Sequence, residues 1–166
     1  MESIPGIRTS SHSGFTLVEL VAVILILGVL AFSVVPRFLD KGSIDAGAMA
    51  EQLANDIRYT QSLAMTSGQR NRINLTPTTY QIATGAGASM AHPATGSTAA
   101  ISLGSVSLSG YNPPLTNSYI AFDGKGIPYT DVSGIALATP ATITLSSAGS
   151  TRQVVVSPTT GRVVVQ

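Results

Sequence analysis

The most apolar part of the chain is residues 15–35, which read FTLVELVAVILILGVLAFSVV. A helix needs about 20 mainly apolar residues, each adding about 1.5 Å, to cross the hydrocarbon core of a bilayer. The pattern therefore predicts a transmembrane helix. Its single ionisable residue, Glu19, would cost on the order of 2.5–3.5 kcal/mol there if it stayed charged and unpaired. We therefore expect this carboxylate to have a partner for its charge.

A second, amphipathic stretch follows at residues 36–67. Because Pro36 lacks an N–H group and disfavours helix at the residue before it, we expect a bend there, after which the helix resumes. Later apolar residues approximate one stripe, at Ile44, Ala48, Met49, Leu53, Ile57 and Ala64, with Asp45, Glu51, Asp56 and Arg58 elsewhere. The Ser67-Gly68 pair predicts the helix end. We expect the stripe to pack on the chain's own sheet, and a partner-binding groove is the alternative.

Beyond residue 68, β-branched and alternating segments predict strands. These segments are residues 72–75, 79–84, 100–108, 119–122, 142–145, 152–156 and 162–165. Residues 123–126 read DGKG, a turn signal, and residues 158–161 read PTTG between two valine-rich runs, which favours a C-terminal hairpin. A long helix followed by an antiparallel sheet predicts an α+β fold.

Composition limits the classes of function. The 166 residues suit one ordinary domain besides the apolar segment, and the absence of cysteine excludes disulfides. The formal charge is +1 with 10% charged residues, which indicates no broad basic face for nucleic acid. Residues 73–122 contain no charged side chain. Within them, residues 84–98 are expected to form a solvated connection, or alternatively a contact surface for another subunit.

Two interpretations of the N-terminus follow from general patterns. The apolar run could be the apolar region of a secretory signal peptide, with Ala31, Phe32 and Ser33 as a small-x-small cleavage site. Glu19 inside the run counts against this interpretation. Alternatively, the run could be an uncut single-span anchor, with Glu19 reaching toward the interface from about one turn inside.

A third interpretation comes from the residues around the start of the run. Residues 14–20, GFTLVEL, closely resemble the class III leader of type IV pilins and type II secretion pseudopilins. Residues 55–64, NDIRYTQSLA, resemble the minor pseudopilin H and FimT-like group. The resemblance implies a leader at residues 1–14, a transmembrane helix at 15–35, its amphipathic continuation at 36–67 and a β-rich head at 68–166. It also implies a pilin-like fold, with the long helix packed on the antiparallel sheet.

The same resemblance implies how the chain is processed and located. A prepilin peptidase would cut after Gly14 and methylate the new amino terminus at Phe15. The protein would be single-pass in the bacterial inner membrane with its head in the periplasm, and then part of a pilus or pseudopilus. Its partners would be the peptidase, an inner-membrane assembly platform, other pilins and membrane lipid. The leader departs from the family in being poor in basic residues, because it contains only Arg8, opposed by Glu2.

Cleavage at this position would give Glu19 a charge partner. The new amine at Phe15 and the carboxylate of Glu19 are four residues apart, so they lie on neighbouring helical turns. Glu19 can therefore neutralise its own amine or that of an adjacent subunit, which the resemblance assigns to filament assembly.

The sequence offers little for catalysis. His92 would be the one histidine of the cut chain, which argues against a histidine metal centre or a serine–histidine relay. We expect no enzyme activity, no cofactor and no metal. A DNA-binding minor pilin is the alternative function, since Arg152 and Arg162 bracket the last predicted hairpin and some FimT-like relatives bind DNA through C-terminal arginines.

Overall fold

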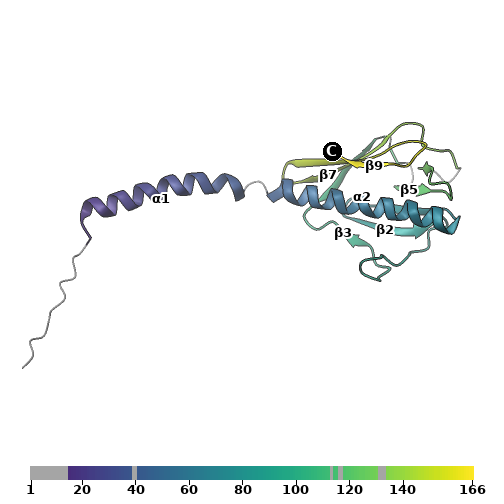
Figure 1. Ribbon diagram of the computed structural model, residues 1–166, viewed down its shortest axis with the longest axis horizontal. Coiled ribbons are helices and arrows are strands. Elements are labelled where there is room, and N and C mark those ends of the chain that lie inside the picture. Colours follow the sequence, from purple (N-terminus) through teal and green to yellow (C-terminus); the bar gives the residue numbers. More distant parts are fainter. Residues whose placement is uncertain (1–14, 39–40, 113, 116–117, 131–133) are drawn as a thin grey trace, which may run out of the picture. The chain divides into compact units, whose positions relative to one another are not determined.

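The computed structural model (Figure 1) describes residues 15–38, 41–112, 114–115, 118–130 and 134–166, and the side chains of residues 32–38 lie outside this description. The chain separates into two compact units, Met1–Leu39 and Asp40–Gln166. Each unit is described by itself. We call the second unit the head.

The first unit contains helix α1, Leu17–Phe38. Its start is capped by Thr16, whose side-chain Oγ1 accepts the backbone N–H of Glu19 at 3.2 Å. Helix continues through Pro36 to Phe38, so Pro36 does not end it, as expected from the sequence. Among the described residues, no helix combines the length and the apolarity that crossing a membrane requires. The transmembrane segment at residues 15–35 stays a prediction, and its last four side chains lie outside the described part.

The head begins with helix α2, Lys41–Ser67. The helix ends where the sequence predicts, because Gly68 follows it with a φ of 66°, a left-handed conformation that glycine adopts without a steric penalty. Its buried face consists of Gly42, Ala46, Ala50, Leu53, Ala54, Asp56, Ile57, Thr60 and Ala64.

The predicted apolar stripe on α2 is wrong at Ile44 and Ala48, whereas Met49 is partly buried against the core, as expected. Ile44 is 69% exposed and Ala48 is also exposed, whereas Gly42, Ala46 and Ala50 are buried. Close backbone contact explains the shift, since a Cβ atom on Gly42 would come within 2.5 Å of the carbonyl oxygen of Ser147. The face with the smallest side chains therefore turns inward, and the larger Ile44 faces solvent.

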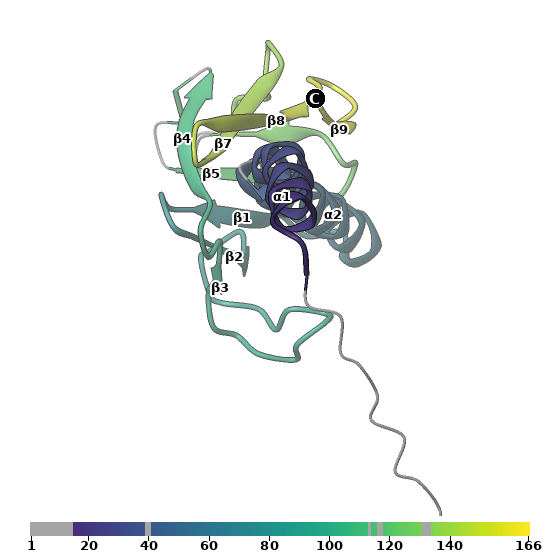
Figure 2. The same ribbon diagram turned by 90° about the vertical axis from the view of Figure 1, so that its left-hand side faces the viewer.

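The strands of the head are antiparallel and form two sheets within the described residues, where the sequence predicted one. The strands are β1 (Asn71–Leu75), β2 (Thr79–Thr84), β3 (Ile101–Ser102), β4 (Ser107–Asn112), β5 (Tyr119–Phe122), β6 (Pro128–Tyr129), β7 (Ala141–Ser147), β8 (Ser150–Val156) and β9 (Val163–Val165). One sheet has the order β3-β2-β1-β5-β6 and the other β4-β7-β8-β9. The α+β class and the pilin-like packing of the helix on antiparallel strands are confirmed, and Figure 2 shows the strands of both sheets on one side of α2.

A turn inside the strand predicted at residues 100–108 separates the two sheets. The N–H of Val106 donates to the carbonyl oxygen of Leu103 at 3.1 Å, and Gly104 between them has a φ of 62°. β3 before this turn pairs with β2, whereas β4 after it pairs with β7. The single predicted strand is therefore two short strands that belong to different sheets.

The core of the head lies between α2 and the inner faces of the sheets. Leu53 and Ile57 of α2 are fully buried and belong to the same apolar cluster as Ile73, Phe122 and Leu145 from the two sheets. Of the predicted stripe, Leu53, Ile57 and Ala64 thus pack on the chain's own sheets, as expected.

The contrast between Leu53 and Ile44 gives a stability test. Leu53→Ala leaves a cavity in the core, so we expect the free energy of unfolding to fall by about 2–5 kcal/mol. Ile44→Ala, on the exposed side of the same helix, should change it by less than about 0.5 kcal/mol. Urea unfolding of the full chain in detergent, followed by circular dichroism, measures both. Equal losses for the two variants would contradict the packing of α2 described above.

Candidate functional site

The structure describes the predicted processing site only from Phe15 onward. Gly14 and Arg8 therefore lie outside the described residues. Phe15 is 81% exposed and Glu19 is exposed as well. Thr16 and Glu19 hold the first and fourth positions of a capping box, in which the cap hydroxyl accepts the N–H of the third helical residue. Sequence reasoning missed this role of Thr16, although the T-x-x-E spacing before an apolar run is its signal.

Helix α1 exposes apolar side chains along its whole described part. Residues 15–31 are all exposed, including Leu17, Val18, Ile24 and Leu25. A helix with apolar side chains all round is stable in water only when something covers it. The surface therefore suits contact with lipid or with other apolar helices.

A buried polar cluster connects α2 to the loop after β2. The hydroxyl of Tyr80 donates to Oδ2 of Asp56 at 2.5 Å, and Nε2 of His92 lies 3.0 Å from Oδ1 of the same carboxylate. The side-chain amide of Gln52 donates to the Tyr80 oxygen at 3.0 Å. The position of Asp56 away from the predicted stripe is wrong, because Asp56 is only 7% exposed. A carboxylate can occupy this buried position because the Tyr80 hydroxyl donates to Oδ2 and the imidazole of His92 lies beside Oδ1, although Nε2 of His92 makes no hydrogen bond to the described residues.

The geometry of this cluster suits a structural role. Burial, followed by the hydrogen bond to Asp56, raises the pKa of the Tyr80 phenol above its ordinary value, so Tyr80 remains a protonated donor. Nδ1 of His92 accepts the N–H of Ala94 at 3.2 Å, so this nitrogen holds its own loop in place. The predicted solvated connection at residues 84–98 is therefore fixed to the core at His92, which is 6% exposed.

Nothing among the described residues gathers three or more side chains with metal-ligating capacity. Asp123 and Asp131 are a candidate carboxylate pair in the sequence, for which solvated turn residues are the favoured interpretation. Asp131 lies outside the described residues, and Asp123 belongs to the turn between β5 and β6, as predicted. Its Oδ1 accepts the N–H groups of Lys125 and Ile127, each at 2.9 Å.

The two arginines of the DNA-binding alternative do not converge. Arg152 lies in β8, and its guanidinium donates to the hydroxyl of Ser43 on α2 at 3.2 Å. Arg162 is exposed, and its carbonyl oxygen accepts the N–H of Ser157, just past the other end of β8. Because strand residues advance about 3.3 Å each, positions 152 and 157 are about 16 Å apart along the strand. DNA binding through this pair stays a prediction.

Comparison with known proteins places these features in context. Residues 9–35 match the family model described as the prokaryotic N-terminal methylation motif. None of the curated proteins compared with this chain matches it. Two crystal structures of the type IV minor pilin FimU from Pseudomonas aeruginosa PAO1 have a similar fold. The first has a TM-score of 0.50 at 18% identity over 72% of this chain and 91% of that one. The second has a TM-score of 0.51 at 17% identity over 75% and 90%.

The head itself matches a second family model. This model is described as the type II transport protein GspH and covers residues 49–160, from the first third of α2 to the connection before β9. Because the match spans more than half of the sequence, this chain belongs to the GspH family of type II transport proteins, within the type IV pilins and pseudopilins.

Proposed function

We propose that this chain is a minor subunit of a type IV pilus or type II secretion pseudopilus that acts by assembly rather than catalysis. The observation that carries the proposal is the run of exposed apolar side chains on α1, which lies within residues 9–35 that match the methylation motif. Before assembly, lipid of the inner membrane covers this surface, with the head in the periplasm. In the filament, the corresponding helices of other subunits cover it.

Processing supplies the charge that Glu19 needs. The prepilin peptidase cuts after Gly14 and methylates the amine of Phe15. Neither step is catalysed by this chain, and the inner-membrane assembly platform then draws the subunit into the filament. Support for this sequence of events comes from the match of the methylation motif to residues 9–35 and from the exposure of both Phe15 and Glu19.

Glu19 has two roles in this proposal that substitution can separate. At the fourth position of the T-x-x-E pattern its side chain can support the start of α1, and a glutamine fits the same pattern. As a carboxylate it pairs with the amine of Phe15 on its own chain or on a neighbouring subunit, and a glutamine cannot replace that charge.

Glu19→Gln therefore tests the assembly role directly. We expect the variant to be cut and methylated normally but to enter filaments roughly tenfold less, because a charge-assisted hydrogen bond of about 1.5–3 kcal/mol is lost. Immunoblots of the filament fraction against total protein measure incorporation, and intact mass reports processing.

Thr16→Ala is the matched control, since it removes the cap hydroxyl but keeps the carboxylate. This variant should lose about 1 kcal/mol of helix stability and still be incorporated. Normal incorporation of Glu19→Gln, or an equal loss for Thr16→Ala, would show that the charge of Glu19 has no part in assembly.

A further inference from the structure

The outer face of the sheet β3-β2-β1-β5-β6 presents two arginines stacked on two tyrosines. Cζ of Arg70 lies 4.4 Å from the ring centroid of Tyr129, and Cζ of Arg72 lies 4.7 Å from that of Tyr119. Arg72 alternates with the buried Ile73 along β1, so its side chain lies on the face away from the core. We call these four residues the arginine–tyrosine face.

The loop after β2 holds both arginines in place. The N–H of Gly85 donates to the carbonyl oxygen of Arg70 at 2.7 Å, and a Cβ atom on Gly85 would come within 2.8 Å of that oxygen. Gly87 has a φ of 96°, and a Cβ atom there would collide with Nη2 of Arg72. Arg72 thus lies between a tyrosine ring and a backbone that only glycine allows to approach so closely. Its guanidinium is preorganised rather than free in solvent.

The charge of these guanidinium groups is not neutralised within the described part of the chain. No ion pair between described residues involves Arg70 or Arg72, and Nε of Arg72 is buried without a hydrogen-bond partner among them. Residues 73–122, which supply the neighbouring strands, contain no carboxylate. Asp123 is engaged by its own turn and by the hydroxyl of Tyr129, which donates to Oδ2 at 3.1 Å.

We propose that the arginine–tyrosine face is a docking site for a carboxylate-bearing segment of another protein subunit, an inference that rests on the proposed assembly function. A fixed guanidinium fork matches a carboxylate through two parallel hydrogen bonds. Arginine and tyrosine are also the residue types enriched where binding energy concentrates in protein interfaces. A partner carboxylate here would provide the counter-charge that the described neighbours lack.

The same observations argue against nucleic acid as the occupant. Tyr119 is only 5% exposed, so Arg72 and its surroundings cover the ring on which a base would stack. Nucleic acid affinity grows with the number of phosphates neutralised, and this face supplies two arginines in a chain of net charge +1. Two well-placed cations suit a discrete pair of carboxylates better than a polyanion.

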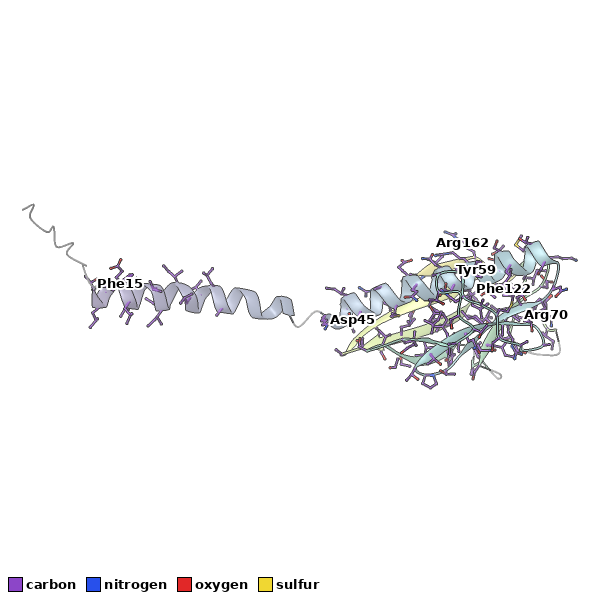
Figure 3. All side chains as sticks on the ribbon, turned by 90° about the horizontal axis from the view of Figure 1, so that it is seen from below. Phe15, Asp45, Tyr59, Arg70, Phe122 and Arg162 are labelled. Carbon is purple, nitrogen blue, oxygen red and sulfur yellow. The ribbon has the colours of Figure 1, made fainter. Side chains whose placement is uncertain are left out.

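The site lies at one end of the head. Arg70 comes three residues after the last residue of α2, and Figure 3 shows it at the opposite end of the head from Asp45, which is in the first turn and a half of that helix. A partner held here therefore contacts the head at the end where α2 finishes.

The test uses full-length protein in detergent with a fluorescently labelled hexaglutamate peptide, and fluorescence anisotropy gives the dissociation constant at low salt. We expect binding that the double variant Arg70→Gln/Arg72→Gln weakens at least about tenfold. Arg152→Gln/Arg162→Gln removes the same charge from another part of the head and is the matched control. It should bind within about twofold of wild type.

A charge-preserving variant shows whether weaker binding comes from a folding defect or from the loss of the guanidinium groups. Arg70→Lys/Arg72→Lys keeps both charges but lacks the planar fork, so we expect affinity between wild type and the glutamine variant, with an unchanged circular dichroism spectrum. A 20-nucleotide single-stranded DNA is the competing probe, and it should bind more weakly than hexaglutamate.

Three results would overturn the proposal: no binding of hexaglutamate, equal weakening by the two glutamine pairs, or tighter binding of the DNA. None of these measurements requires cleavage, methylation or a filament. A failure here would therefore leave the assembly function standing, and a failure of Glu19→Gln to impair assembly would not alter the peptide result.

Discussion

Covering apolar surface is the constraint on which the organisation of this chain depends. Along α2, Leu53 and Ile57 are fully buried against the two sheets, and the head has a core of its own. Along the described part of α1, every side chain is exposed, although most of them are apolar. The head can thus cover its apolar residues internally, whereas the first unit by itself cannot cover the apolar side chains of α1. The same difference between a self-contained head and an uncovered helix is expected of a subunit that polymerises through one helix while its head stays folded.

The start of α1 shows how one local element can serve both folding and assembly. Thr16 accepts the N–H of Glu19, so the first turn of the helix is stabilised by the chain itself. This cap leaves the carboxylate of Glu19 exposed and available to a cation. The proposed cut after Gly14 would place that cation, an amine, at the first residue before the cap. The hydrogen bond that caps the helix at Thr16 and the proposed charge pair of Glu19 therefore both favour a helix that begins directly after Phe15.

Much of the head could be predicted from the sequence where local chemistry decides the structure. The bounds of β2 and β5 agree with the predicted residues 79–84 and 119–122, because both segments are rich in aromatic and β-branched residues. Gly68 likewise marked the end of α2. The predicted stripe failed at Ile44 because the close approach of Gly42 to the β7–β8 turn, a contact between distant parts of the chain, sets the rotation of α2. Long-range partners also explain the burial of Asp56 and the stacking of Arg72 on Tyr119. No spacing in the sequence indicates which tyrosine or histidine will meet them.

The central claim is that cleavage creates a cationic amine beside Glu19 at the start of an exposed apolar helix. Intact mass and N-terminal analysis of the protein extracted from membranes tests this most directly. The account predicts a mature chain that begins with N-methylated Phe15. A chain that begins at Met1 would contradict it, because the amine would then be far from Glu19 in sequence. A chain that begins at Val34 would contradict it as well, because the apolar helix would have been removed as a signal peptide.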